Sequence, residues 1–392
     1  MASSSDANNA TTPYLLPVGI DLGSLNSRIA IIREDSAEAQ IIPNTQGQHF
    51  THAISTPESE PENGKKTEFI YGDAAQRHLI RSGSQERPEE YLVRKMCRQA
   101  ASDDDDNGSN GDDDGARTVK ESSAGAFLGH LTELACDASA VKPSTLRVVV
   151  SVPNGGSPDV IKGVLKCCDA GVKGLIASKE GKRKKKEMAK EDLVLGVISD
   201  AAAVCVAHGL TKLTKTEETT TNGSANGNHA TFPNRKRCLV IDWGNSGLNL
   251  TWLSILNADD TAPLLHTVET THHANCSGEK ILSTLVQHLV TAFKTKHRAY
   301  RNENILASKK TAFKLHNAAK DAVKTLSQTN TTAVFIDGVF DGLDLNASLT
   351  RARWEMLCGP MLRLAEAALR GVYKRCCREG DEVVVLTAGG GC

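Results

Sequence analysis

Apolar and polar residues alternate on both sides of a short Asp-Leu-Gly segment near the start of the chain. The run 18–22 enters this segment and the run 28–33 leaves it, which predicts a β-hairpin with a glycine-containing turn. Backbone N–H groups at such a turn form an anion-binding concavity, and a neighbouring carboxylate can hold a hydrated metal ion. The pattern is compatible with an ordinary hairpin and also with a phosphate site.

A second copy of this pattern lies in the second half of the chain. Residues 238–242 form an apolar run that ends in Asp242, a glycine-rich turn follows, and residues 248–255 form the next apolar run. The repetition favours the phosphate-site interpretation. Two such units predict two related lobes that face each other across one nucleotide.

The remaining pattern predicts strands that alternate with helices. Further strands are expected at 146–152, at 332–346 as a pair, and at 382–387, and helices at 159–170, 197–209, 278–297, 307–326 and 350–373. Strands that alternate with helices indicate an α/β architecture with mixed sheets.

Four segments carry too few apolar residues to offset the entropy of ordering, so we expect surface loops there. They are residues 1–12, 102–116, 178–192 and 214–234. The expected organisation is therefore a tail at 1–12, a first lobe at 13–212 with inserts near 102–116 and 178–192, a linker at 213–235, and a second lobe at 236–392.

Composition narrows the class of protein further. The 392 residues suffice for two domains, and the net charge of −1 gives no global attraction to DNA or to an acidic membrane. The 11 cysteines include no paired C-x-x-C spacing, which favours a reducing compartment. No basic, apolar leader begins the chain and no apolar run of about 18 residues occurs in it. We expect a cytoplasmic protein without a membrane span.

Two clusters of chemically active side chains leave alternatives open. The basic run Lys182–Lys186 is compatible with a solvated loop, with a nuclear localisation patch or with a contact to ribosomal RNA. His272, His273 and Cys276 suggest zinc, but their spacing is irregular and a fourth ligand is missing. We therefore interpret these three as loop residues beside a phosphate-contacting glycine.

The order of these segments resembles the nucleotide-binding domain of the heat-shock protein 70 family, which has the actin/hexokinase-like ATPase fold. The collinear segments are 19–27, 42–47, 71–75, 150–153, 200–210, 238–251, 277–279, 324–327, 336–344 and 350–358. The resemblance implies an α/β fold of two lobes, with mixed sheets and helices around a nucleotide cleft. In the family the domain continues beyond the final Gly-Gly turn, so we expect either a truncated product or a shortened relative.

The resemblance assigns ATP or ADP and Mg²⁺ to this chain. Asp21 and Asp242 correspond to the two aspartates that position Mg²⁺ through water. The residues that correspond to nucleotide contacts are Gly23, Ser24, Leu25, Asn26, Gly244, Asn245, Ser246, Gly247, Gly278, Glu279, Lys324, Ser327, Gly389 and Gly390. On this basis we expect magnesium-dependent binding that is weaker than in a complete family member.

The catalytic positions implied by the resemblance depart from the family pattern. Arg94, or less naturally Lys95, stands where the family has a catalytic lysine, and Asp200 stands where it has a glutamate. Gly247 replaces a threonine and Asn249 replaces an aspartate in the second turn. Phosphoryl transfer depends on placement and charge stabilisation, so these changes predict weak or absent hydrolysis.

The pattern of departures is most similar to atypical family members that act in the ribosome-associated complex with a zuotin-type J-protein. It implies a chaperone or co-chaperone that assists the folding of nascent chains, with a J-domain partner and contact with ribosomes. The alternative is an active, ATP-hydrolysing chaperone of the same family. A sugar or glycerol kinase on the same fold is disfavoured, because the resemblance continues through 340–344 and 350–358.

Overall fold

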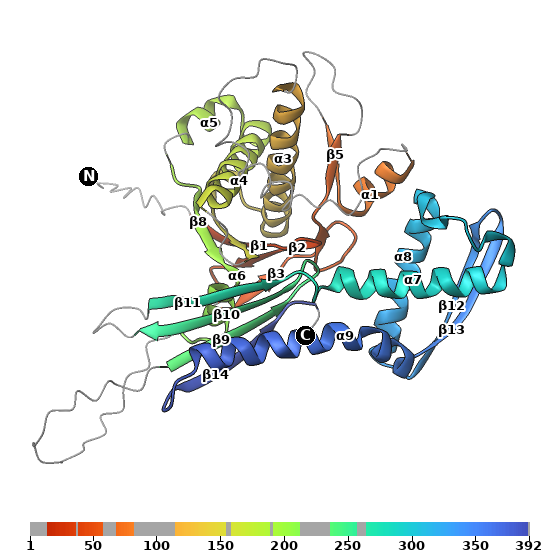
Figure 1. The fold of residues 1–392 in the computed structure, drawn as a ribbon. Helices are drawn as coiled ribbons and strands as arrows, with labels where there is room; N and C mark the ends of the chain where they lie inside the picture. The colour runs from red at the N-terminus through yellow and green to blue at the C-terminus, as the bar shows by residue number, and fades with distance from the viewer. Residues whose placement is uncertain are drawn as a thin grey trace, which may run out of the picture. The chain divides into compact units, whose positions relative to one another are not determined.

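The computed structural model describes residues 14–36, 38–57, 68–81, 114–153, 158–188, 191–211, 236–256 and 264–390. These residues form two compact units (Figure 1). The first contains the described residues up to Leu79 and those from Asp114 to Ile198, and the second contains Ile80, Arg81 and the described residues from Ser199 to Gly390. Each unit has its own sheet and its own hydrophobic core.

The sheet of the first unit has the order β3-β2-β1-β7-β8, and β4 pairs with β2 at its edge. β1 runs antiparallel to β2 and parallel to β7. Its strands are β1 (Leu16–Leu22), β2 (Asn26–Ile32), β3 (Ala39–Ile41), β4 (Thr51–His52), β7 (Leu146–Val152) and β8 (Val194–Ser199). Alternate residues of β1 and β7 are buried, as expected for strands with one face on a core.

Two long helices, α3 (Asp114–Ser139) and α4 (Pro158–Lys179), lie side by side over the sheet of the first unit (Figure 1). Glycines allow the close approach, because a Cβ on Gly171 would lie 2.3 Å from the backbone oxygen of Gly125. The smaller elements of this unit are β5 (Ser55–Pro57), β6 (Phe69–Tyr71), α1 (Gly72–Arg81), α5 (Lys182–Glu187) and a 3-10 turn at Pro143–Thr145.

The sheet of the second unit has the order β11-β10-β9-β14, which repeats the order β3-β2-β1-β7 of the first. In both, the central strand is antiparallel to the next strand of its hairpin and parallel to a strand from later in the chain. The strands are β9 (Lys236–Trp243), β10 (Leu248–Leu256), β11 (Leu264–His273) and β14 (Glu382–Ala388). The two units therefore share a common sheet topology.

Helices cover both faces of this second sheet. Cys238 and Val240 of β9 pack in one cluster with α6 (Asp200–Ala207), whereas Leu239 packs in another with α9 (Arg351–Cys376). Side chains alternate between the two faces of a strand, and a strand buried on both faces is expected to be apolar throughout. This explains the uninterrupted burial along β10 from Leu248 to Ile255.

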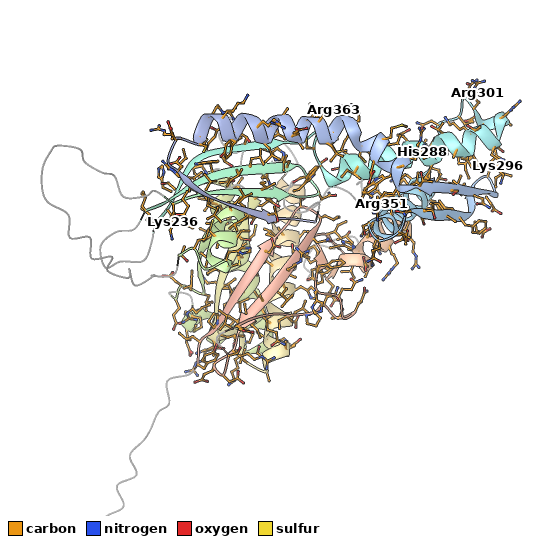
Figure 2. All side chains as sticks on the ribbon, turned by 90° about the horizontal axis from the view of Figure 1, so that it is seen from below. Lys236, His288, Lys296, Arg301, Arg351 and Arg363 are labelled. Carbon is orange, nitrogen blue, oxygen red and sulfur yellow. The ribbon has the colours of Figure 1, made fainter. Side chains whose placement is uncertain are left out.

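A third cluster in the second unit packs two helices against a β-ribbon. Its elements are α7 (Gly278–Lys296), α8 (Lys309–Leu326), β12 (Thr331–Phe340), β13 (Leu343–Thr350) and 3-10 turns at Arg298–Tyr300 and Ile305–Ala307. Arg351, at the start of α9, donates from Nε to the backbone oxygen of Leu326 at 2.8 Å, where α8 ends (Figure 2). Thr350 caps α9 by accepting from the N–H of Arg353.

The structure confirms most of the strands and helices expected from the sequence and corrects three segments. Residues 114–116, which we expected within a loop insert, are the start of α3. A helix expected from Val197 is wrong at its start, because β8 continues to Ser199 and α6 begins at Asp200. Ser199 ends the strand and caps α6, accepting from the N–H of Ala202 at 3.1 Å. Residues 178–192 are not a loop throughout, because α4 extends to Lys179 and α5 follows it.

The division into units also differs from the expected lobes in one element. We placed residues up to 212 in the first lobe, whereas α6 packs with β9 and β14 of the second unit. Within the described residues, no helix has the length and apolar character needed to cross a membrane.

Candidate functional site

The turn between β9 and β10 is a closed loop held by backbone hydrogen bonds. The N–H of Gly244 donates to the oxygen of Gly247 at 2.9 Å. The first amides of α7 also bond to the turn: Gly278 N–H donates to the Gly244 oxygen, and Glu279 N–H donates to the Asn245 oxygen, both at 3.1 Å. A Cβ on Gly278 would lie 3.3 Å from the Cα of Asn245, so the helix start approaches the turn closely. The structure thus brings residues 244–247 and 278–279 together.

Three polar side chains stand in a row across the strands beside this turn. The strand registers place Asn249 of β10 opposite Asp242 of β9 and opposite His272 of β11. Asn249 donates from Nδ2 to Oδ2 of Asp242 at 2.9 Å, and its Oδ1 lies 2.6 Å from Nδ1 of His272. Asn249 is 5% exposed. Since the amide nitrogen donates to a carboxylate, the amide oxygen must accept, and His272 carries its proton on Nδ1.

Gly247 is required by the position of the His272 ring. A Cβ on Gly247 would lie 2.4 Å from Cε1 of His272 and 3.0 Å from its Nε2. These distances are shorter than atomic contact, so any side chain at position 247 would displace the ring. The replacement of threonine by Gly247, which the resemblance implied, is therefore coupled in space to His272.

Gly389, which follows β14, lies beside the β9–β10 turn. β14 lies parallel to β9, with Ala388 opposite Asp242. Gly389 has a φ of +91°, and a Cβ on it would lie 2.4 Å from the backbone oxygen of Trp243 and 2.7 Å from Oδ1 of Asp242. Both the positive φ and the close approach demand glycine. A Cβ on Gly390, the next residue, would have no heavy atom within 4 Å.

The hairpin of the first unit is built in the same way. Gly23 lies so close to the end of the turn that a Cβ would be 2.4 Å from the backbone oxygen of Asn26. Leu25 accepts a hydrogen bond from the N–H of Ala53, which fixes the turn to the next segment. Ser24 lies between Gly23 and Leu25 in this turn.

Asp21 forms an ion pair across this hairpin. Arg28 lies opposite Asp21 in the β1–β2 register, and its Nη1 is 3.2 Å from Oδ2 of Asp21. The two side chains are 48% and 43% exposed, so water screens the pair. Sequence reasoning did not single out Arg28, although the alternation of a hairpin places the residue seven positions after Asp21 directly across from it.

Asp200 is the first residue of α6. The helix packs on the β9 face that carries Cys238 and Val240, and by alternation Asp242 points to that same face. Cys205 of α6 and Cys238 of β9 are fully buried, with their sulfur atoms 3.7 Å apart. The hydrogen bond from Cys205 and the burial raise the pKa of the Cys238 thiol. These contacts fix α6, and with it the start of the helix at Asp200, against the sheet.

Lys324 and Ser327 lie at the exposed end of α8. The Ser327 hydroxyl donates to the backbone oxygen of Lys324 at 2.7 Å, and the Ser327 N–H donates to the oxygen of Val323. Both side chains are exposed. Their chain neighbours Val323 and Leu326 pack in the cluster of α7, α8, β12 and β13, whereas Leu248, which ends the turn, packs in the cluster that contains α9.

The other candidate residues are accounted for as follows. Arg94 and Lys95 lie outside the described residues. His272 and His273 lie in strand β11, so our assignment of them to a loop is wrong. Cys276 is buried and its thiol donates to the backbone oxygen of Met361, while His273 Nε2 lies 3.2 Å from the Thr271 hydroxyl. The described residues contain no group of three His, Cys, Asp or Glu side chains placed to hold a metal ion.

A family model described as "Hsp70 protein" matches residues 193–391, which is just over half of the chain. This chain belongs to the Hsp70 family. The family consists of ATP-binding chaperones with an actin-like ATPase fold, and it generally binds ATP or ADP with Mg²⁺. The match contains the second turn, the start of α7, the end of α8 and the Gly389 turn.

Curated relatives match 43–50% of the chain. "Heat shock cognate 70 kDa protein 3" of Dictyostelium discoideum is 30% identical over 193 residues, which is 48% of this chain and 27% of that protein. "Heat shock 70 kDa protein" of Penicillium citrinum is 29% identical over 170 residues, with 43% and 28% covered. "Heat shock 70 kDa protein 14" of Macaca fascicularis is 25% identical over 198 residues, with 50% and 34% covered. The matched region spans about a third or less of each of these relatives.

The two aspartates that the resemblance links to Mg²⁺ each have a nitrogen donor at one carboxylate oxygen. Mg²⁺ needs oxygen ligands whose negative charge faces the ion or its waters. Asp21 is paired with the guanidinium of Arg28, and Asp242 accepts from the amide of Asn249, at a position where the resemblance implies a carboxylate. Each aspartate thus directs one oxygen at a nitrogen donor of the protein.

Proposed function

We propose that this chain binds ATP or ADP and acts as a chaperone or co-chaperone of Hsp70 type whose capacity for hydrolysis is degenerate. The observation that carries the proposal is the hydrogen bond from Asn249 to Asp242, 2.9 Å long, in a turn that keeps its backbone contacts to α7 and Gly389. The scaffold that would hold phosphate is retained. The charge that would act on the reacting groups is reduced.

The expected loss of hydrolysis follows from the sensitivity of phosphoryl transfer to placement. The protein supplies position and charge in this reaction, and a displacement of about 1 Å can cost on the order of 100-fold in rate. Asn249 is neutral where the resemblance implies a carboxylate, and Asp200 is one methylene shorter than the implied glutamate. Both changes would act against the same attacking water.

Nucleotide binding is tested by titration calorimetry and thermal unfolding of the full chain with ATP or ADP. A ligand that binds the folded state must stabilise it by mass action. We expect heat of binding and a rise in Tm at millimolar nucleotide. A folded protein with neither response would refute nucleotide binding.

Hydrolysis is tested by single-turnover measurements on the double variant Asn249→Asp with Asp200→Glu. We expect turnover to rise, because the variant returns charge and reach to the water site. Asn346→Asp with Asp321→Glu is a matched control, since both residues are exposed and belong to β13 and α8. An equal rise in the control would show that general charge, and not the site, is responsible.

The second candidate function is an active Hsp70 chaperone ATPase. Asp21 and Asp242, which the resemblance links to the metal, are both retained. A normal family rate of turnover in the unmodified chain would establish this alternative and refute the degenerate-site argument.

We further propose a J-domain partner of zuotin type, with ribosomes and nascent chains in the cytoplasm as the setting. Nucleotide binding without turnover suits a protein that docks on another chaperone component. Helix α5 offers a second contact, because it carries five consecutive basic residues, Lys182–Lys186, and the Arg183 side chain is 96% exposed. Clustered positive charge binds RNA phosphates through counterion release.

Sedimentation through sucrose at low and high salt separates these contacts. Ribosome association that disappears without the J-protein supports docking, and association lost on neutralising Lys182, Arg183, Lys185 and Lys186 supports RNA contact. Neutralising Lys296, Lys310, Lys320 and Arg370 removes equal charge from exposed residues of the second unit. Free protein under every condition, with no J-protein crosslinked, would contradict the partner proposal.

A further inference from the structure

We propose that His272 is a phosphate-binding residue of the β9–β10 turn, and that its Nε2 donates to a phosphate oxygen of the nucleotide once the ring has taken up a second proton. This inference rests on the proposed nucleotide binding and adds one residue and one proton to it. Every residue on which it depends belongs to the second unit.

Strand pairing brings His272 to the turn. β11 lies at one end of the strand order of its sheet, beside β10 (Figure 1), and His272 stands opposite Asn249. A Cβ on Gly247 would lie 2.4 Å from Cε1 and 3.0 Å from Nε2 of His272, so the ring occupies the place of the side chain that Gly247 lacks. His272 is exposed, so a ligand on the turn can reach the ring.

The turn itself offers main-chain donors beside the ring. The backbone bonds that close the turn and join it to α7 use the N–H of Gly244 and the oxygens of Gly244, Asn245 and Gly247. Among the residues that the structure describes, none of these bonds uses the N–H of Asn245, Ser246 or Gly247. Consecutive N–H groups in a turn form a concavity that binds anions. The imidazole of His272 thus stands beside a backbone that is suited to phosphate.

The bond to Asn249 decides which ring nitrogen meets the phosphate. Asn249 donates to Asp242, so its amide oxygen accepts from Nδ1 of His272 at 2.6 Å. Nδ1 is thereby committed to the protein, and Nε2 is the second nitrogen beside the turn. A phosphate oxygen without a proton only accepts, so Nε2 must carry a proton to bind it. With protons on both nitrogens His272 is an imidazolium cation, and the second proton comes from the solvent.

The charged groups around His272 explain why a cation is useful there. Asp242 of β9 lies on the same face of the sheet, two strands away. α6 packs on this face and begins with Asp200, and α7 brings Glu279 to the turn. β10 carries no charged residue, and His273 of β11 points to the opposite face. The three carboxylates repel a phosphate and attract an imidazolium. Protonation of His272 therefore offsets negative charge that would otherwise oppose phosphate binding.

The test is titration calorimetry of the full chain with ADP and excess Mg²⁺, in buffers of different ionisation enthalpy, at about pH 6.5 and about pH 8.5. Histidine titrates near neutral pH, so the affinity of the unmodified chain should fall by about tenfold as the pH rises over this range, and binding should take up protons. His272→Gln keeps an amide that can bond to Asn249 but does not titrate. It should show no such fall and no proton uptake beyond that of ADP itself.

His273→Gln is the matched control, because it removes the same residue type from the same strand on the opposite face of the sheet. It should behave as the unmodified chain does in both measurements. A fall in affinity that His273→Gln abolishes and His272→Gln retains would assign the proton to the wrong face and overturn the inference.

A second set of variants separates contact with the ligand from support of the fold. His272→Ala should weaken ADP binding by about tenfold or more, as expected for a hydrogen bond between charged groups. Adding Gly247→Ser places a hydroxyl donor where the ring stood and should recover most of the lost affinity, without proton uptake. Adding Gly247→Ala fills the same space without a donor and should not recover it.

The outcomes separate this inference from the function on which it rests. ADP binding with the same pH dependence in the unmodified chain and in His272→Gln would overturn the inference and leave nucleotide binding intact, as would equal recovery by serine and alanine at 247. Absence of ADP binding at both pH values would overturn both. Nitrogen NMR of the unmodified chain with isotope-labelled histidine reports the ring directly, and a His272 that stays neutral with bound ADP would also overturn the inference.

Discussion

Because Gly247 lies against His272, the effect of Gly247→Ala on the free energy of unfolding depends on the residue at 272. The substitution should destabilise the chain when residue 272 is histidine and stabilise it when residue 272 is alanine. Alanine at 247 would place its Cβ 2.4 Å from Cε1 of His272 in the unmodified chain. The ring must then move, and its hydrogen bond to the buried Asn249 is lost. The φ of Gly247 lies outside the left-handed region, so alanine brings no backbone strain of its own.

The magnitudes follow from the two opposing effects. Loss of the partner of a buried acceptor costs about 1–3 kcal/mol, whereas Gly→Ala at a permitted φ stabilises by about 0.4–1 kcal/mol through the unfolded chain. We expect Gly247→Ala to lower the free energy of unfolding by about 1–2 kcal/mol in the unmodified chain. With His272→Ala already present, the same substitution should raise it by about 0.4–1 kcal/mol.

Urea unfolding followed by tryptophan fluorescence is the suitable assay. All three tryptophans of the chain, Trp243, Trp252 and Trp354, lie in the second unit, so the signal reports that unit. The double-mutant cycle should give a coupling energy of about 1.5–3 kcal/mol. Additive effects of the two substitutions would refute the steric argument, and so would a neutral Gly247→Ala.

Two further predictions concern other parts of the structure. Gly389→Ala should destabilise by about 2–4 kcal/mol in the same assay, because of its positive φ and its closeness to Trp243, whereas Gly390→Ala should change stability by less than about 1 kcal/mol. Burial lowers the pKa of His130 below 6.5, where it stacks on Tyr71. The unfolded chain therefore binds more protons, and the first unit should lose stability as the pH falls from 6.5 through the folded pKa. Unfolding followed by circular dichroism should show this slope, and His130→Phe should reduce it.

Strands and helices in which apolar residues recur with a clear period could be predicted from the sequence. The two hairpins were predicted because apolar runs flank an Asp-x-Gly turn in each, and the structure confirms both. α3 was not predicted from the sequence. Glycines weaken a helical pattern, and in α3 Gly125 and Gly129 are where Gly171 of α4 approaches. β11 was missed because most of its residues are polar and exposed.

The site could be predicted less completely than the fold. The glycines and aspartates of the turns are local features of sequence, so they could be identified without a structure. Arg28 and His272 act through strand register, which brings residues from different strands face to face. The sequence signal for His272 was Gly247, because a glycine in a tight turn indicates that a neighbouring residue occupies the space of the missing side chain. The pairing of β10 with β11 is needed to identify that neighbour as His272.

The hydrogen bonds of α7 to the β9–β10 turn couple the direction of the helix to the position of the turn. Its first two amides, Gly278 and Glu279, donate to carbonyl oxygens of the turn, so the helix start follows any movement there. The helix has 19 residues and is therefore about 28 Å long, ending at Lys296 beside the β12–β13 ribbon. A tilt of about 5° at the turn moves that far end by about 2.5 Å. α7 thus connects the β9–β10 turn to the β12–β13 ribbon through one continuous helix.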